Sequence, residues 1–498
     1  MQLMKRVRLT ILLVLLLLIP AGGITYLLAT PRLISVTPQA NAEEIAALSP
    51  LRLEFSRKMD AGSVGERLLI QPSIPGEISW DGRGRILTFT PSVPWPSGDT
   101  IQVRLATGAS ASGFLPFIIR QEASWSFTIG QPNLVYLYPS DGPPNLYLLN
   151  PYDGRTRQLT NYLEGVTDYD IDRNGLVAYY SVDTPDGSLI YAIEDITRSD
   201  AQPSGASEST LEGTFESTPE GTPEGTPEGT PEPILALNCQ QARCSSPRLA
   251  PDGSYLAYER ISFTAPGEHA FPQVWVLPLN QGLPTVDARP RLIGATDHQT
   301  LQPQWSPVGL LLFYDTTATA YIVRDPDGLE VQRFPNGTGY PGSWDPGGKF
   351  FIAPEITYPS VFPAEADPFG VSHLIQYSLS EDSPRDLSAQ DNVEDAFPAY
   401  APSGDLVVFS RKYLDIARST PGRQVWLMQS DGTNPRAITN EPIYNHFDFT
   451  WSPDEKMLVY VRFEQTELTQ APEIWVYDMS IEKAWRLLRG GFAPRWIP

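Results

Sequence analysis

The residues best suited to metal or acid–base chemistry in this chain are its histidines. Imidazole is a common metal ligand and general base, and such sites often show a local spacing such as His-Glu-x-x-His. No two histidines here share one, so we expect them in solvent-facing loops. The alternative is a metal held by histidines that the fold gathers from distant segments. The four are His269, His298, His373 and His446.

A short acidic run resembles the start of a calcium-binding loop. Asp170, Asp172 and Asn174 alternate before Gly175, and oxygen ligands at alternate positions can converge on one Ca²⁺. The twelfth position of such a loop is a glutamate, but here it is Ser181. An apolar run also follows the glycine directly. We therefore interpret the segment as a hairpin turn, and we expect neither a metal nor another cofactor.

Cys239 and Cys244 are the only cysteines. Two thiols cannot build a zinc site alone, and no histidine follows at finger spacing. In an oxidising compartment the pair can close a small loop, so we expect a local disulfide that contributes roughly 2 kcal/mol at most.

Two further motifs carry little chemistry. The sequence contains no Gly-x-Ser-x-Gly elbow of the kind that serine hydrolases use. Asn336-Gly337-Thr338 fits a glycosylation sequon, but so short a pattern is common by chance.

Composition limits the partners and the fold. The 498 residues include 36 Lys and Arg against 58 Asp and Glu, a net charge of −22. Such a chain is repelled by phosphate backbones, which excludes nucleic acid as a partner. The 49 prolines and 38 glycines favour short strands and many turns, so we expect a nearly all-β protein.

The N-terminus predicts a membrane anchor. Lys5, Arg6 and Arg8 precede an uncharged run, Leu9 to Leu28, which is long enough to cross a bilayer as a helix. By the positive-inside rule, the chain beyond about residue 31 lies outside the cytoplasm. We expect a single-pass cell-membrane protein with residues 1–30 as stub and anchor. The alternative is a cleaved signal peptide with small residues at Ala21-Gly22-Gly23.

Residues 31–130 predict an Ig-like β-sandwich. Apolar and polar residues alternate in Leu51–Phe55, Ile101–Leu105 and Trp125–Ile129, and turn signals separate the runs. The stretch resembles the bacterial Ig-like domains of surface-layer and other envelope proteins. That resemblance implies a spacer or adhesive module without catalysis. The segments that carry it are Ile34–Pro38, Leu53–Asp60, Leu87–Pro91 and Trp125–Thr128.

Residues 131–498 contain a repeated phrase such as Trp451-Ser452-Pro453-Asp454, with a period of about 40 to 56 residues. Each copy ends a short strand, turns, and leads into apolar runs, which predicts four strands per repeat and therefore a propeller blade. A residue needed once per blade packs blade against blade; the alternative is a stacking platform for sugar rings. The residues at this position are Leu249, Trp305, Trp344, Tyr400, Trp451 and Trp496.

This pattern resembles the WD40-like propellers of the TolB type, whose blades open with Trp-Ser-Pro-Asp-Gly. The last residues, Pro494 to Pro498, open a blade with no blade after it, whereas the first blade, from Asn133, lacks that phrase. We therefore expect a seven-bladed ring in which the C-terminal strand completes the first blade. A low-complexity insertion at about 198–233, with three Thr-Pro-Glu-Gly copies, interrupts the second blade.

These features favour a non-catalytic, membrane-anchored binding or scaffold protein outside the cytoplasm. Its propeller would engage an envelope protein, peptide or glycan. One alternative is a propeller-type carbohydrate-active enzyme, a lyase or a glycosidase, and another is a purely structural envelope component. Fold alone does not choose among them.

Overall fold

The computed structural model describes residues 30–497, except for 44, 46, 48, 114–116, 173, 174, 176, 195, 197–231, 264–270, 281, 286, 358–370, 382, 391 and 468. The expected membrane span, most of the expected insertion, Asn174 and His269 lie outside the described residues. Among the residues described, no helix is long and apolar enough to cross a membrane.

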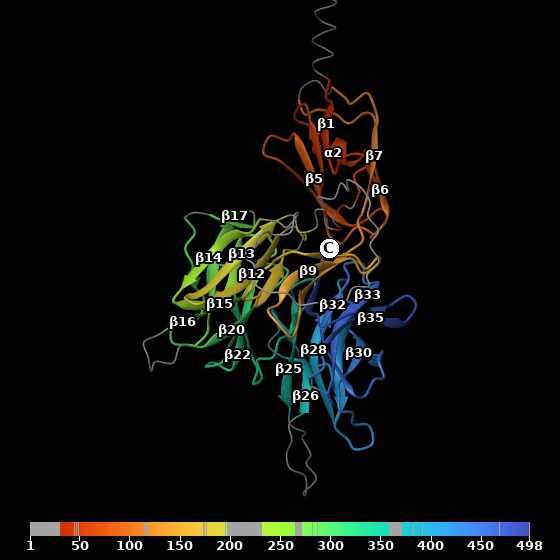
Figure 1. Cartoon of the computed structure of the whole chain (residues 1–498). Coiled ribbons are helices and arrows are strands. Elements are labelled where there is room, and N and C mark those ends of the chain that lie inside the picture. The colour runs from red at the N-terminus through yellow and green to blue at the C-terminus, as the bar shows by residue number, and fades with distance from the viewer. Residues whose placement is uncertain are drawn as a thin grey trace, which may run out of the picture. The chain divides into compact units, whose positions relative to one another are not determined.

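The chain divides into two compact units, Met1–Gln131 and Pro132–Pro498. In the first unit, two antiparallel sheets have the strand orders β1-β2-β5-β4 and β3-β6-β7 (Figure 1). Their elements are β1 (Leu33–Thr37), β2 (Leu51–Phe55), α2 (Ala61–Gly65), β3 (Leu68–Gln71), β4 (Gly76–Trp80), β5 (Ile86–Pro91), β6 (Thr100–Leu105) and β7 (Ala123–Thr128).

The first unit has its own hydrophobic core, built from the strand alternation. Leu51, Leu53 and Phe55 on β2 are buried, and the residues between them are not. Trp95 is fully buried at one end of the core and donates its Nε1–H to the Ser49 carbonyl (3.0 Å). Alternate residues of each strand therefore fill the space between the sheets.

The described part of the second unit consists of antiparallel sheets of consecutive strands. The strand orders are β10-β9-β8-β36, β11 to β14, β15 to β18 with β19, β20 to β23, and β32 to β35. Strands β24 to β27 and β28 to β31 join as one eight-stranded sheet through a single parallel pair, Ser372 with Glu394.

The strands of the second unit are β8 (Asn133–Tyr138), β9 (Asn145–Leu149), β10 (Thr156–Gln158), β11 (Asp168–Ile171), β12 (Val177–Thr184), β13 (Gly187–Glu194), β14 (Ile234–Gln240), β15 (Ala242–Leu249), β16 (Tyr255–Ser262), β17 (Gln273–Asn280), β18 (Leu283–Pro284), β19 (Arg291–Leu292), β20 (Thr300–Trp305), β21 (Leu311–Asp315), β22 (Ala320–Arg324), β23 (Glu330–Pro335), β24 (Ser343–Trp344), β25 (Phe350–Thr357), β26 (Val371–Ser378), β27 (Arg385–Asp386), β28 (Val393–Tyr400), β29 (Leu406–Tyr413), β30 (Gln424–Gln429), β31 (Arg436–Ala437), β32 (Tyr444–Trp451), β33 (Met457–Glu464), β34 (Glu473–Asp478), β35 (Lys483–Arg489) and β36 (Phe492–Ile497).

Apolar clusters join these groups of strands in a closed circuit. One cluster packs Val135 and Ile497 against Tyr169, and the next packs Tyr179 against Leu249. Further clusters link each group to the one that follows it along the chain. The last cluster returns from Val459 to the first group. Because every group packs on two neighbours and the last meets the first, the second unit is a β-propeller.

The C-terminal strand β36 pairs with β8, as the sequence predicts. Trp496 lies opposite Leu134, and Ile497 lies opposite Asn133. The first and last strands of the second unit therefore share one sheet, and no open edge is left between the first and last groups of strands.

The repeated phrase acts as a turn device. The residue after the Trp position is often Ser or Asp, and its side chain accepts a backbone N–H at the start of the next strand. Ser306 Oγ accepts from Leu310 (2.9 Å), Asp345 Oδ1 from Phe350 (2.6 Å), and Ser452 Oγ from Met457 (2.9 Å). The side chain thus replaces the hydrogen bonds that the backbone lacks in the turn.

Candidate functional site

The predicted disulfide between Cys239 and Cys244 is present. Cys239 lies on β14 and Cys244 on β15, so the bond joins two neighbouring sheets across the turn at Gln241. Ser188 Oγ on β13 contacts both backbone groups of Cys244, accepting from its N–H (2.6 Å) and donating to its carbonyl (3.1 Å). Both cysteines are buried.

The aromatic residues of the repeat position lie between neighbouring groups of strands. The indole N–H groups of Trp305, Trp451 and Trp496 each donate to a carbonyl of the preceding group: Arg248 (2.9 Å), Ala399 (3.3 Å) and Thr450 (3.1 Å), respectively.

The other three members of the set differ in their contacts. The Trp344 Nε1 is buried without a partner among the described residues. Tyr400 accepts from Gln376 of the preceding strands (2.9 Å), and Leu249 packs in the apolar cluster beside Tyr179.

The expectation of histidines in solvent-facing loops is wrong for two of them. His373 on β26 and His446 on β32 are buried. His373 Nδ1 lies 2.7 Å from Asp386 Oδ2, and His446 Nε2 lies 3.2 Å from Glu441 Oε2. These carboxylates offset the free-energy cost of burying a polar ring. The spacing of the histidines in the sequence cannot reveal such partners.

His298 is partly exposed, and its hydrogen bond to Asp315 raises its pKa. Within the described residues, no group of three or more His, Cys, Asp or Glu side chains could hold a metal ion.

The calcium-like run has structural partners instead. Asp172 Oδ1 accepts from the Val177 N–H (2.7 Å) across the hairpin turn. Asp170 Oδ2 accepts from the Leu249 N–H (2.8 Å) of the next sheet, and burial raises the pKa of this carboxyl. Asp172 therefore stabilises the turn before β12, and Asp170 stabilises the contact between β11 and β15.

Charged side chains gather on the first strands of several sheets. In this ring the strands β11, β15, β20, β24, β28, β32 and β36 are the innermost ones, because most neighbouring members of this set contact each other. Arg248 on β15 pairs with Asp168 on β11 (3.0 Å), and Arg495 on β36 pairs with Asp448 on β32 (2.8 Å). Asp448 is the main reason that the pKa of Arg495 is raised. Nearby on β16, burial raises the pKa of Glu259.

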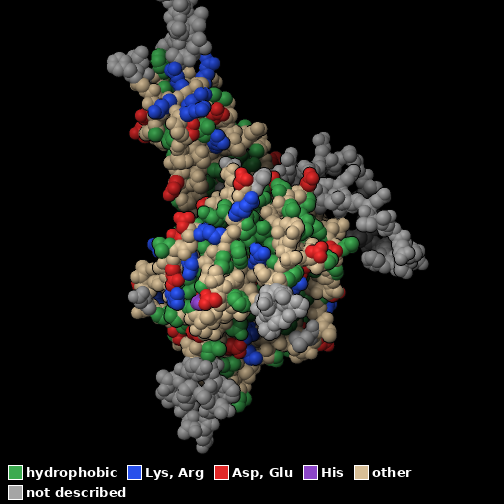
Figure 2. Space-filling view, turned by 90° about the vertical axis from the view of Figure 1, so that its left-hand side faces the viewer, with side chains coloured by type: hydrophobic (Ala, Val, Ile, Leu, Met, Phe, Trp, Pro, Cys, Tyr) green, Lys and Arg blue, Asp and Glu red, His purple; other side chains and the backbone are tan. Residues whose placement is uncertain are grey.

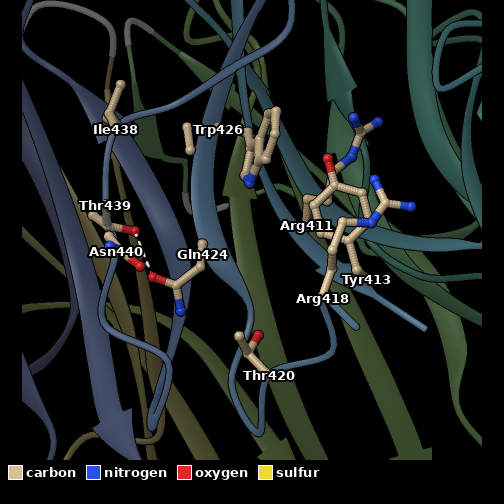
Figure 3. A pocket seen from close by; sticks show the side chains of 10 residues that line it. Arg411, Tyr413, Arg418, Thr420, Gln424, Trp426, Ile438, Thr439 and Asn440 are labelled. Carbon is tan, nitrogen blue, oxygen red and sulfur yellow. Dashed lines mark hydrogen bonds between the residues drawn. The ribbon is translucent and has the colours of Figure 1, made fainter. Parts of the chain in front are cut away.

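The candidate binding site is a cavity of about 610 Å³ in the part of the sheet formed by β29 to β31 and the segment before β30 (Figure 3). Its lining residues are Arg411, Tyr413, Arg418, Thr420, Gln424, Trp426, Ala437, Ile438, Thr439 and Asn440. The sequence analysis did not predict this site.

Arg411 is held by a buried ion pair. Its guanidinium binds both carboxylate oxygens of Asp395 (2.7 and 2.6 Å), and neither side chain is more than 1% exposed. Its Cζ lies 5.1 Å from the ring centroid of Trp426 and 5.0 Å from that of Phe409. The two hydrogen bonds to Asp395 fix the orientation of the guanidinium, and its charge lies near the Phe409 and Trp426 rings.

A second arginine of the lining, Arg418, lies on the same side as Arg411 and is more exposed (Figure 3). Arg418 lies over the Tyr413 ring (3.9 Å from Cζ to the centroid) and pairs with Asp415 (2.6 Å). The Tyr413 and Trp426 rings meet edge to face, with centroids 6.0 Å apart. Trp426 is partly exposed, and Asn440 is exposed. Aromatic, amide and guanidinium groups therefore surround one hollow, as Figure 3 shows.

Hydrogen bonds hold Gln424 in place. Its Oε1 accepts from Thr439 Oγ1 (3.1 Å) and from the Glu441 N–H (2.7 Å), and its Nε2 donates to the Glu441 carbonyl (2.9 Å). This side of the cavity is thus preformed. Its lining offers aromatic, guanidinium, amide and hydroxyl groups, which suit recognition by stacking and hydrogen bonding.

The tryptophan of the cavity, Trp426, belongs to a repeated arrangement of a tryptophan beside an arginine. Trp275, Trp426 and Trp475 occur in similar runs, and each lies beneath an arginine of the neighbouring strand: Arg260 (5.1 Å), Arg411 (5.1 Å) and Arg462 (3.7 Å). The runs were recognisable as strands. The pairing with arginine was not, because it depends on the register between strands.

A comparison with protein families supports the assignment of the first unit as an Ig-like domain. Residues 29–129 match the bacterial Ig-like domain family, which confirms the domain expected there. A comparison with curated proteins finds no match.

Several solved structures are similar to between 48% and 78% of the chain. TolB from Agrobacterium tumefaciens is 14% identical, with a TM-score of 0.36, over 72% of this chain and 90% of that one. An oligogalacturonate lyase in complex with manganese is 18% identical, with a TM-score of 0.36, over 48% and 64%. Puromycin hydrolase is 12% identical, with a TM-score of 0.48, over 78% and 52%, so this chain spans about half of it.

Proposed function

We propose that this chain is a non-catalytic, membrane-anchored binding or scaffold protein outside the cytoplasm. In this proposal an envelope protein, peptide or glycan inserts a side chain or a sugar ring into the cavity beside Trp426. The observation that carries the proposal is that cavity, in which aromatic faces lie next to preformed hydrogen-bonding groups. Clefts of this size and lining suit ligands of a few residues.

Two features support the proposed location. The uncharged run at residues 9–28 is long enough for a span, and the basic residues precede it. The disulfide Cys239–Cys244 suits an oxidising compartment.

We further propose that the ring has seven blades. Counting β24 to β27 and β28 to β31 as separate blades gives seven groups, because only one residue pair joins them. The apolar clusters between consecutive groups support this division, since the cluster of Leu374 and Val407 packs the two groups face to face.

Fluorine NMR on protein labelled with 5-fluorotryptophan tests the binding site. The Trp426→Phe variant identifies the Trp426 signal, and Trp485, an exposed side chain on β35, provides a reference signal. Soluble peptide and glycan fragments of the cell envelope are the probes. We expect one class to shift the Trp426 signal saturably and to leave Trp485 unchanged, with weaker binding in Arg418→Ala. If no fragment shifts Trp426 more than Trp485, the cavity is not the binding site.

A carbohydrate-active enzyme, lyase or glycosidase, is the second candidate. The observation in its favour is the pair of carboxyls with raised pKa, Asp170 and Glu259, near Arg248 on the inner strands, because perturbed acids gather at active sites. Metal analysis and product detection with glycan substrates test it. Turnover that Glu259→Gln abolishes would replace the binding proposal with this one.

A further inference from the structure

One end of the first unit carries basic side chains from three chain segments. Arg32 precedes β1, Arg57 and Lys58 follow β2, and Arg83 and Arg85 precede β5. Figure 2 shows Lys and Arg side chains gathering on this unit. We call these five residues the basic end.

Backbone contacts hold the three segments together. The Arg32 N–H donates to Ser56 Oγ (3.0 Å), and the Ser56 N–H donates to the Arg32 carbonyl (2.9 Å). The Met59 N–H donates to the Gly84 carbonyl (2.9 Å), and Arg85 Nε donates to the Phe55 carbonyl (3.2 Å). The basic end is therefore a built surface of the sandwich.

The side chains of the basic end are accessible to solvent. Arg32, Lys58 and Arg83 are exposed, and Arg57 and Arg85 are partly exposed. Asp81 lies in the same turn as Arg83 and accepts the backbone N–H groups of Arg85 (2.6 Å) and Ile86 (2.8 Å). Glu54 and Asp60 lie on the same segments and are partly exposed and exposed, respectively. Five cations therefore outnumber three carboxylates at this end of the unit.

The charge of the chain is divided unevenly between the two units. Residues 132–498 contain 24 Lys and Arg against 49 Asp and Glu, whereas residues 30–131, which exclude the expected stub and anchor, contain 9 against 9. A net charge of −25 on the propeller therefore contrasts with a net charge of zero on the Ig-like unit, whose cations gather at the basic end. An anionic surface attracts the basic end and repels the propeller.

The covalent chain places the basic end near the proposed anchor. Arg32 follows Leu28 by four residues, which reach at most roughly 14 Å when extended. The strand β2 begins at the opposite end of the sandwich, where Trp95 binds the Ser49 carbonyl and the Gly98 N–H binds the Ile129 carbonyl before the chain leaves the unit. The chain thus enters the sandwich at the basic end and leaves it at the other.

We propose that the basic end binds the headgroups of anionic lipids in the membrane that residues 9–28 span, and so holds the Ig-like unit against that surface. The proposal rests on the membrane anchoring in the proposed function. Lysine and arginine side chains within about a Debye length of an anionic leaflet are attracted to it, and the attraction weakens with salt.

Vesicle binding of residues 30–498 tests the surface without the anchor. This fragment contains every described strand and both hydrophobic cores. We expect it to sediment with vesicles that contain phosphatidylglycerol and not with phosphatidylcholine vesicles. Binding should disappear near 1 M salt, where the Debye length is about 3 Å.

Charge reversal locates the contact. The triple variant Arg32→Glu, Lys58→Glu and Arg83→Glu should weaken binding to anionic vesicles by on the order of a hundredfold. The matched control Arg289→Glu, Lys349→Glu and Lys483→Glu changes the total charge equally on exposed residues of the second unit. It should change binding far less. Equal losses in both variants would show a net-charge effect and overturn the proposal.

The remaining outcomes separate this proposal from the anchoring. Full-length protein should stay in membranes through a high-salt wash. If it does, and the fragment shows no preference for anionic vesicles, the basic end is not a lipid surface. If the fragment binds an anionic polymer but not the vesicles, the partner is that class of polymer. If the full chain washes off while the fragment binds anionic vesicles, residues 9–28 do not anchor the protein, but the basic end does bind anionic lipids.

Discussion

The ion pair of Asp395 and Arg411 is the most deeply buried charge pair beside the cavity. Ser388 Oγ also donates to Asp395 Oδ2 (2.6 Å), and Gln390 accepts from Arg411 (3.0 Å). Because these contacts satisfy both charged groups, the pair keeps the guanidinium in place under Trp426. Removing one partner would leave the other charge buried without compensation.

We therefore expect Asp395→Asn to lower the free energy of unfolding by about 3–5 kcal/mol. The comparison is Asp415→Asn, which removes the partner of the more exposed Arg418 and should cost less than about 1 kcal/mol. Urea unfolding monitored by circular dichroism measures both. Similar losses in the two variants would contradict the role assigned to the buried pair.

Glu441 gives the molecule a specific acid sensitivity. The hydrogen bond from His446, followed by that from Arg462, lowers the pKa of Glu441 from its ordinary 4.5 to about 2. A carboxyl with a lowered folded pKa contributes stability above its unfolded pKa and loses that contribution as the pH falls toward about 2. Solvent reduces the effect, since this side chain is 36% exposed.

We expect Glu441→Gln to be less stable than the natural chain at neutral pH and to approach it as the pH falls from about 4.5 to about 2. Melting temperatures across this range measure the difference. A gap that stays constant with pH would mean that the carboxylate's charge does not contribute.

At the scale of elements, two of the repeated tryptophans, Trp344 and Trp451, have similar burial but different hydrogen bonds. Trp344 is 6% exposed and Trp451 is 7% exposed. The Trp451 N–H reaches the Ala399 carbonyl of the preceding strands, whereas the Trp344 N–H has no partner among the described residues. An unsatisfied buried donor costs free energy, while a paired one stabilises the junction.

Replacing either tryptophan by phenylalanine removes a similar volume. The difference between the two losses in unfolding free energy therefore reports the contribution of the hydrogen bond. We expect Trp451→Phe to destabilise the protein by about 1 kcal/mol more than Trp344→Phe. Equilibrium unfolding measures both variants. If Trp344→Phe is the more damaging, packing rather than hydrogen bonding decides this position.

The strand pattern could be predicted from sequence, but the cavity could not. The apolar runs and the Ser-Pro turns locate the inner strands, because Ser452 and its equivalents act within a few residues. The outer strands are harder to find, since β27 and β31 have only two residues each. The cavity needs Arg411 and Trp426 in register on β29 and β30, with Thr439 just after β31, and the buried histidines need carboxylates from other chain segments. No local pattern encodes either arrangement.

At the scale of the whole molecule, closure depends on the last strand. Pairing of β36 with β8 was foreseeable, because Pro494 to Pro498 repeat a blade opening that the first blade lacks. The structure adds two contacts that the sequence does not show. Arg495 pairs with Asp448, and the Tyr169 hydroxyl donates to the Val135 carbonyl (2.8 Å) and the Ala493 carbonyl (2.5 Å). The last strand thus binds both of its neighbouring sheets.

Deleting residues 492–498 should therefore open the ring. The deletion removes buried Trp496 and Ile497, the hydrogen bonds to β8 and the pair with Asp448, so we expect a loss of at least about 3–5 kcal/mol. It also exposes an unpaired edge at β8, which favours association between copies. The variant Arg495→Ala keeps the strand and should stay monomeric with a smaller loss. Calorimetry and light scattering measure both effects. A truncated protein that melts with the full chain and stays monomeric would show that the shared sheet does not close the ring.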